Sequence, residues 1–344
     1  MCKIATKIRS IIKYLIVGIS YVVNKCIPQS KNLAIFDTSI GSSNLGDTII
    51  CDYCNGFLKD VLPKEQPFRV PTHVKPRVTD IRNLACYKNK ILCGTNIISP
   101  DIGFYFGWKM PKHLFGYFNI ITLAVGLGCY SKEITKKSAY LYRIILSKKS
   151  LHSVRDSYTE QMFRKMGIHN VINTGCVTLW KLTPDFCAEI PVTKASKVIT
   201  TITDYHRDFR ADREMLEILA KNYDTIYIWP QGENDLEYIN GLIDTSKVTI
   251  VDRNLEAYRK ILRQGDVDYV GTRLHAGIDA LNHKVRSIVI AIDNRAIELG
   301  RDVNLPLVHR NQIGDYLQLL ITSAWETKLN IPWENIDRWK EQFR

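Results

Sequence analysis

The sequence of 344 residues lacks the short motifs that assign a nucleotide or metal site directly. The loop at residues 41–47 contains two glycines, but it has neither the Gly-Lys-Ser/Thr of a P-loop nor a Gly-x-Gly-x-x-Gly pattern. The single Cys-x-x-Cys, at Cys51 and Cys54, has no second pair, and a structural zinc site needs four ligands. These absences argue against a P-loop, a dinucleotide fingerprint and a zinc site.

Long apolar runs are also missing. Residues 11–23 are mostly apolar, but Lys13 interrupts them and they fall short of the ~20 residues that a transmembrane helix needs. No small-residue cleavage site follows, so a secretory signal is not predicted. The nine cysteines are odd in number and irregularly spaced, as expected for reduced thiols that pack as small hydrophobes. We therefore expect a cytoplasmic protein.

Acidic residues are absent before Asp37, although the whole chain contains 35 of them and carries a net charge of +12. The first 31 residues hold +6, half of that total. The remaining chain shows no stripe of Lys and Arg with interleaved aromatics, so we expect no nucleic-acid partner. The six N-terminal basic residues are Lys3, Lys7, Arg9, Lys13, Lys25 and Lys31.

The same N-terminal segment has helical periodicity, and residues 1–30 are therefore treated as a separate basic amphipathic segment. Such a helix can lie in the interface of an anionic membrane, which here is the inner face of the cytoplasmic membrane. It can equally be a terminal helix packed on the protein's own body, and both alternatives stay open. The apolar residues at helical spacing are Ile4, Ile8, Ile11, Leu15, Ile19 and Val22.

From residue 31 onward, short apolar runs alternate with longer stretches of helical periodicity. Glycine follows several of these runs, for example Gly94 and Gly126, which is typical of parallel strands covered by helices on both faces. The predicted strands are residues 33–36, 90–93, 120–125, 151–154, 198–202, 225–229, 267–270 and 287–292. One helix is predicted directly after residue 47. The other predicted helices occupy residues 138–146, 157–166, 212–221, 255–263, 274–281, 315–322 and 333–343.

A break in this alternation falls between Pro184 and Lys197, where prolines and polar residues predict a linker. We therefore expect an α/β fold with two doubly wound, Rossmann-like domains at residues 31–188 and 189–344, the second ending in helices. Two such domains would face a cleft, and ligands of these sheets bind beyond the carboxyl ends of the strands.

The most informative segment is residues 268–277, Asp-Tyr-Val-Gly-Thr-Arg-Leu-His-Ala-Gly. A strand ends at its valine, and Thr272 is a good N-cap for the helix that follows. The free N–H groups at a helix start favour an anion, and Arg273 adds a fork that can bind a carboxylate or phosphate. His275 is suited to proton transfer near neutral pH. From the residues alone, a surface arginine and a structural histidine remain an equal alternative.

Other candidate residues also follow predicted strands. Arg155 could reach the cleft, but its residue pattern alone favours an ion pair with Asp156. In the loop at 41–47, Asn44 and Asp47 can bind a sugar hydroxyl or cap the next helix. Gln231 follows another strand end and can face the cleft, whereas Cys176 is expected to be buried packing.

Several of these segments, taken in order, resemble the polysaccharide pyruvyl transferase family. Arg-Leu-His-Ala at residues 273–276 is the most telling of them, and the resemblance extends over roughly residues 33–305. The matching segments are Asn-Leu-Gly-Asp at 44–47, Ser-Val-Arg-Asp-Ser at 153–157, Thr-Gly-Cys…Trp at 174–180, Gly-Thr-Arg-Leu-His-Ala at 271–276 and Asp-Asn-Arg…Glu-Leu at 293–299.

The resemblance implies a fold like the glycosyltransferases of the B type. It also implies phosphoenolpyruvate as donor and a sugar of a cell-surface polysaccharide or its lipid-linked precursor as acceptor, with a pyruvate ketal as product. Arg155, Arg273 and His275 become donor-binding positions, and His275 is assigned to the phosphate. Asp47 is the candidate base. Neither a metal nor a cofactor is expected.

The short Gly-Thr-Asn at residues 94–96 departs from the glycine-rich turn of that family. Asn44, Thr272 and Gln231 complete the predicted substrate-binding residues. Two other functions stay open on this evidence. One is a sugar-nucleotide-dependent glycosyltransferase of the same architecture, and the other is a catalytically silent scaffold that docks on a membrane through residues 1–30.

Overall fold

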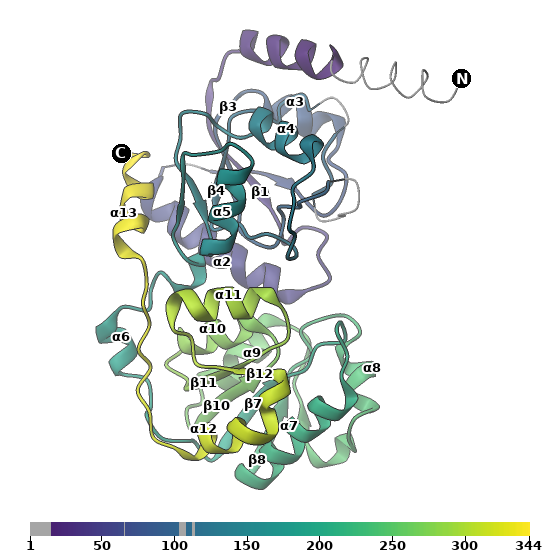
Figure 1. Ribbon diagram of the computed structural model, residues 1–344, viewed down its shortest axis with the longest axis vertical. Helices are drawn as coiled ribbons and strands as arrows, with labels where there is room; N and C mark the ends of the chain where they lie inside the picture. The colour runs from purple at the N-terminus through teal and green to yellow at the C-terminus, as the bar shows by residue number, and fades with distance from the viewer. Residues whose placement is uncertain (1–14, 65, 103–107, 112–113) are drawn as a thin grey trace. The chain divides into compact units, whose positions relative to one another are not determined.

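The computed structural model describes residues 15–64, 66–102, 108–111 and 114–344, which divide into two compact units. Unit 1 consists of the described residues up to Gly41, of Cys54–Asn173 and of Glu334–Arg344. Unit 2 consists of Ser42–Tyr53 and Thr174–Trp333. The chain thus passes between the units several times, and this division differs from the boundary predicted at residue 188 (Figure 1).

Unit 1 is built on a parallel sheet in the order β2-β1-β3-β4. Isolated parallel β-bridges connect the last strand of this sheet to the segment around the parallel pair β5-β6. Leu33 to Asp37 of β1 are all buried, as expected for a strand covered on both faces. The strands are β1 (Lys31–Asp37), β2 (Phe68–Pro71), β3 (Tyr87–Cys93), β4 (Ile120–Leu123), β5 (His152–Val154) and β6 (Val171–Asn173). The helices are α2 (Leu45–Val61), α3 (Val78–Leu84), α4 (Lys136–Ile145), α5 (Ser157–Lys165) and α13 (Trp333–Glu341), of which α2 and α13 each cross a unit boundary.

Unit 2 contains a six-stranded sheet in the order β12-β11-β10-β7-β8-β9, in which every neighbouring pair is parallel. The chain adds β8 and β9 on one side of β7, and then β10, β11 and β12 on its other side. This is the Rossmann strand order, and it places the topological switch point between β7 and β10. The strands are β7 (Lys197–Thr201), β8 (Thr225–Ile228), β9 (Thr249–Ile250), β10 (Val267–Gly271), β11 (Ser287–Ala291) and β12 (Leu307–His309).

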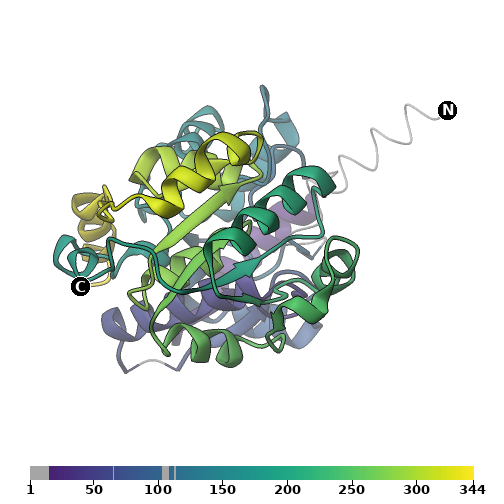
Figure 2. The ribbon, with the colours of Figure 1, turned by 90° about the horizontal axis from the view of Figure 1, so that it is seen from below.

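Helices cover both faces of this sheet. Successive side chains of a strand point to opposite faces, so neighbouring residues of β7 enter different cores. Val198 of β7 packs in one core with residues of α7 and α12, whereas its neighbour Ile199 packs in another core with residues of α9 and α10. Figure 2 shows helices on both faces of this sheet. The predicted doubly wound architecture is confirmed. The helices of unit 2 are α6 (Pro184–Ala188), α7 (Phe209–Asn222), α8 (Asp235–Asn240), α9 (Leu255–Leu262), α10 (Leu274–Leu281), α11 (Asn294–Val303) and α12 (Gln318–Thr322).

Each predicted strand corresponds to one of these strands, but the predicted linker at 184–197 is wrong at its start. Pro184 is the first residue of α6, and the Thr183 hydroxyl caps that helix by accepting from the backbone N–H of Phe186 at 3.2 Å. Proline suits the first turn of a helix because its missing N–H has no helical partner there. The helix predicted at 315–322 begins as a π-helical turn, Ile313–Leu317, before α12.

Residues 15–26 form a helix, and residues 1–14 of the predicted N-terminal segment lie outside the described residues. Val17, Ser20 and Asn24 of this helix are buried in unit 1. Packing on the protein's own body, one of the two alternatives for residues 1–30, is therefore observed for residues 15–26. Among the described residues, no helix combines the length and the apolar content that crossing a membrane requires.

Buried His152 should make unit 1 sensitive to acid. Its Nδ1 accepts from the Thr122 N–H at 3.3 Å, its Nε2 donates to the Ser147 carbonyl at 2.8 Å, and burial lowers its pKa to about 4. The unfolded chain binds this proton near pH 6.5, so stability is complete above that pH and falls as pH drops towards 4, by about 3 kcal/mol. We expect the melting temperature of wild type to fall more than that of His152→Gln between about pH 7 and pH 4.5. Equal losses in calorimetry would contradict this.

Candidate active site

The centre of the site is the turn where β10 ends beside β7, at the switch point of unit 2. Gly271 is required there, because a Cβ added to it would lie 2.5 Å from Thr201 Oγ1. The N–H of Thr272 donates to the Thr201 carbonyl at 2.9 Å, and the Thr272 hydroxyl accepts from the Thr203 N–H at 3.0 Å. These contacts hold the carboxyl ends of the two central strands together.

Helix α10 starts directly after this turn, and all eight of its residues are buried. Thr272 was predicted as its N-cap, but Arg273 occupies that position, and the Thr272 hydroxyl instead serves the neighbouring loop after β7. The Tyr269 hydroxyl donates to the Arg273 carbonyl at 2.8 Å, which fixes the backbone at the start of the helix. A Cβ on Gly277 would lie 2.8 Å from the Tyr269 ring, so the helix packs closely on the sheet.

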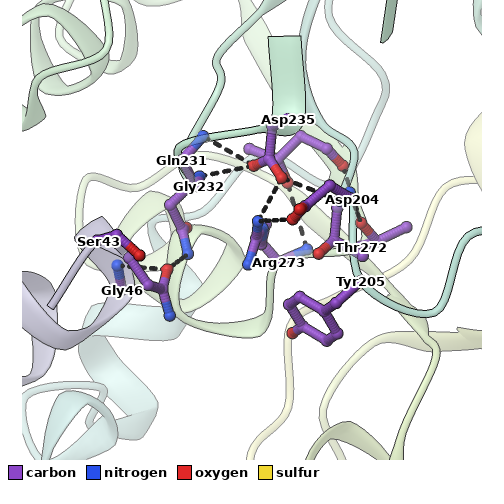
Figure 3. Close-up of polar contacts among 12 residues, drawn as sticks. Ser43, Gly46, Asp204, Tyr205, Gln231, Gly232, Asp235, Thr272 and Arg273 are labelled. Carbon is purple, nitrogen blue, oxygen red and sulfur yellow. Dashed lines mark hydrogen bonds and ion pairs between the residues drawn. The ribbon is translucent and has the colours of Figure 1, made fainter. Parts of the chain in front are cut away.

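Arg273 is buried, and its guanidinium is held by acidic and aromatic neighbours (Figure 3). Nη2 forms a hydrogen-bonded ion pair with Asp235 and lies 3.6 Å from the Asp204 carboxylate. Asp235 also accepts from the N–H groups of Gln231 and Gly232, at 3.1 and 2.7 Å. Within the described part of the chain, Arg273 Nε is buried without a hydrogen-bond partner, so the fork retains an unused donor.

Gln231 links this centre to the start of α2. Its Nε2 donates to Asn44 Oδ1 at 2.7 Å, and the same oxygen accepts from the Gly46 N–H at 3.1 Å. Counting the residues that the structure describes, Gln231 Oε1 is buried without a hydrogen-bond partner. A buried unsatisfied acceptor is costly, and it is a group that a bound ligand can satisfy.

A second arginine, Arg295, also lies beside Tyr205. The Tyr205 ring centroid is 4.9 Å from Arg273 Cζ and 5.2 Å from Arg295 Cζ. Arg295 also pairs with Asp293, which caps α11, and it donates to the Tyr205 hydroxyl. Asp204, Asp235 and Asp293 thus supply three carboxylates beside two guanidiniums. Both arginines of this unit are therefore partly neutralised by neighbouring carboxylates.

His275 is buried in the first turn of α10, and its Nε2 lies 3.8 Å from the Sγ of Cys176. The Thr178 hydroxyl donates to the same sulfur at 3.0 Å. Cys176 is buried, as expected, but it packs against a predicted catalytic side chain rather than against apolar residues alone. The sequence does not indicate this contact, because Cys176 and His275 lie far apart in the chain.

One pocket of unit 2 collects five predicted residues, namely Asn44, Gln231, Thr272, Arg273 and His275. Asp47 does not line it: this residue lies in the first turn of α2 and accepts from the Ser42 hydroxyl at 2.6 Å. Sequence reasoning missed Tyr205, whose surroundings contain no recognisable motif. The pocket is lined by Asn44, Tyr205, Gln231, Thr272, Arg273, Leu274, His275, Ile292, Asp293, Arg295 and Ala296.

Arg155 belongs to unit 1, at the carboxyl end of β5. The predicted ion pair is present, since Nε lies 3.2 Å from the carboxylate of Asp156, which also caps α5. The guanidinium is buried, and across the residues described here its Nη1 and Nη2 have no hydrogen-bond partner. Gly126 makes room for it, because a Cβ there would lie 2.5 Å from Arg155 Cζ. Unit 1 therefore contains a buried cation that is only partly satisfied.

Comparison with known proteins identifies the family. No curated protein matches the chain. Two solved structures of UDP-GlcNAc 2-epimerase from Methanocaldococcus jannaschii, one of them in complex with UDP-GlcNAc and UDP, each share 12% identity with it. They match it with TM-scores of 0.52 and 0.50, over 90% of this chain and 98% of theirs. At this identity the likeness shows the fold alone, and the predicted Rossmann-like, glycosyltransferase-B-like class is confirmed.

The sequence model that matches the chain is described as polysaccharide pyruvyl transferase, and the match extends over residues 44–294. It includes the Asn44 loop, the Arg155 segment and the turn that carries Arg273 and His275. The chain therefore belongs to the polysaccharide pyruvyl transferase family, a family of enzymes.

Proposed function

We propose that the protein transfers a pyruvyl group from phosphoenolpyruvate to a sugar of a cell-surface polysaccharide or of its lipid-linked precursor. The product is a pyruvate ketal. The observation that carries this proposal is the pocket at the switch point of unit 2, where Arg273 and His275 stand at the start of a buried helix. The family supplies the reaction class, and the residues supply the chemistry.

The proposed reaction joins two hydroxyl oxygens of one sugar to C2 of phosphoenolpyruvate. The C2–O bond to the phosphate breaks, and positive charge develops at C2 on the way. One hydroxyl proton ends on the methylene carbon, which becomes a methyl group, and the other leaves with the phosphate. The site must therefore hold an anionic donor, protonate carbon and remove a proton from the acceptor.

Arg273 and His275 are proposed to act on the donor. Asp235 orients the Arg273 fork while its Nε stays available to a carboxylate or phosphate oxygen. His275 is placed at the phosphate, where it gives a proton or adds positive charge as the phosphate departs. Arg155 is the proposed donor ligand of unit 1, because its two unsatisfied nitrogens match a bidentate anion.

Asp204 is a better candidate than Asp47 for the base that accepts the sugar proton. The Asp47 carboxylate is engaged by the Ser42 hydroxyl, whereas the Asp204 carboxylate stands beside the Arg273 guanidinium. Asp204 lies 3.6 Å from Arg273 Nη2, and its side chain is 21% exposed, so an acceptor can reach it.

Thermal-shift binding tests the donor. Phosphoenolpyruvate at about 100 times its Kd should stabilise the protein by about 2.7 kcal/mol, because only the folded state binds it. The increase in melting temperature should vanish in Arg273→Ala and persist in Arg301→Ala, which removes an exposed arginine of the same unit. With an acceptor glycan, phosphate release and a ketal-bearing product should follow. A shift with sugar nucleotides alone, accompanied by nucleotide release, would instead identify a glycosyltransferase.

A further inference from the structure

The helix at residues 15–26 is amphipathic, and it places its apolar side away from the protein. Ser20 and Asn24, both polar, are buried together with Val17. The ring of Tyr21 packs edge-on against Phe118, with 5.3 Å between the ring centroids. The helix is thus docked on unit 1 through a partly polar face, which leaves its more apolar face uncovered.

The uncovered face carries five large aliphatic side chains, which are between 42% and 63% exposed. Their spacing of one, three and four residues puts them on adjoining stripes of one helix face. Elsewhere in the described chain, exposed large apolar residues occur singly or in pairs, for example Phe209 alone and Tyr316 with Leu319. A contiguous apolar face marks an interaction surface rather than ordinary surface composition. We call this the apolar face, and it consists of Leu15, Ile16, Ile19, Val22 and Val23.

The stretch of sequence that carries the apolar face is basic. The first 31 residues carry six basic and no acidic side chains. Phe118, which holds Tyr21, precedes β4, so the helix lies at the edge where the strands of unit 1 begin. The exposed side chains of Lys88, Lys148 and Lys149 stand at the same edge, just before or at the start of β3 and β5.

The helix thus lies at the amino ends of these parallel strands, whereas Arg155 lies at their carboxyl ends. Parallel strands all begin at one edge of a sheet and end at the other, and Arg155 follows the end of β5. In Figure 1 the helix lies at the same end of unit 1 as α3 and α4. A surface that binds at the apolar face would therefore leave the carboxyl ends of these strands uncovered.

We propose that the apolar face and its basic surroundings dock unit 1 on an anionic lipid membrane. Aliphatic side chains can enter the boundary between headgroups and acyl chains, while lysines at the margin pair with lipid phosphates. The absence of acids before Asp37 fits a negatively charged surface and not a basic or neutral one. This proposal does not depend on the identity of the transferred group.

Vesicle flotation of the full chain tests the docking. We expect binding to vesicles of phosphatidylcholine with phosphatidylglycerol, and at least tenfold weaker binding to phosphatidylcholine alone. Ile19→Glu should lower the affinity for the anionic vesicles at least tenfold, because it puts a charge into the apolar boundary. Leu319→Glu is the matched control: that side chain is 61% exposed, against 63% for Ile19, but it lies on α12 of unit 2. Its binding should equal that of wild type.

A double change of Lys148 and Lys149 to alanine tests the basic edge, with an expected loss of about fivefold in affinity for each charge. The proposal is overturned if wild type does not float with anionic vesicles, if it floats equally with both kinds, or if Ile19→Glu binds like Leu319→Glu. A chain that dimerises in solution, loses the dimer in Ile19→Glu and ignores vesicles would instead make the apolar face an interface between copies.

Discussion

Arg273→Ala is expected to lower turnover by roughly 10²–10³-fold, the effect of removing one charged group that stabilises a transition state. The side chain is buried in the pocket of the switch point and has an unused donor at Nε. Arg273→Lys should recover little of the lost rate, because an ammonium group keeps the charge but lacks the planar fork. Rates of phosphate release with donor and acceptor present measure both effects.

Stability must be separated from catalysis in this variant. Removing Arg273 leaves the fully buried Asp235 without its cation, which typically costs 3–5 kcal/mol. The double variant Arg273→Ala with Asp235→Asn removes that charge, while the asparagine oxygen can still accept from the Gln231 and Gly232 N–H groups. We expect the double variant to regain melting temperature and to stay inactive. Wild-type turnover in it would remove Arg273 from the site.

Arg155→Lys is expected to lower kcat/KM by about 10²-fold, with only a small change in the free energy of unfolding. Lysine keeps a positive charge near Asp156 but cannot present the two nitrogens that are unsatisfied in the described structure. A binding role also predicts that stabilisation by phosphoenolpyruvate is lost. Normal binding of phosphoenolpyruvate in a destabilised Arg155→Lys would show that the residue is structural.

Gly126→Ala tests the same guanidinium without changing it. The added Cβ would lie 2.5 Å from Arg155 Cζ, so the side chain must move. We expect a loss of donor binding that parallels the loss in Arg155→Lys. Gly56→Ala is a matched control, because a Cβ at that position meets no atom within 4 Å. Its activity should remain at the wild-type level.

The sequence predicted the parts of this molecule that depend on local pattern. Short stretches rich in apolar residues located the central strands, because a strand buried on both faces is mostly apolar. The short edge strands escaped: β2 ends in Pro71, and β9 has two residues. The unit boundaries also escaped, since the assignment of residues 42–53 to unit 2 rests on contacts between distant segments.

The candidate site was predictable where residues follow a central strand directly. Thr272, Arg273 and His275 follow β10, and the strand order brings them to the switch point. Asp204 and Tyr205 follow β7 on a loop of ordinary composition, and Asp235 begins α8 after β8. Only the fold shows that these residues surround Arg273. The partial neutralisation of Arg273 could not be predicted for the same reason.

The way in which the chain passes between the units has a consequence for biosynthesis. Unit 1 starts first on the ribosome, yet its segment Glu334–Arg344 is made after all of unit 2. The Trp339 ring of that segment packs 5.9 Å from Phe57, a residue made nearly three hundred positions earlier. Domains usually fold as units during synthesis, in order from the N-terminus. Unit 1 is therefore begun first but completed last, because its final segment is translated only after the whole of unit 2.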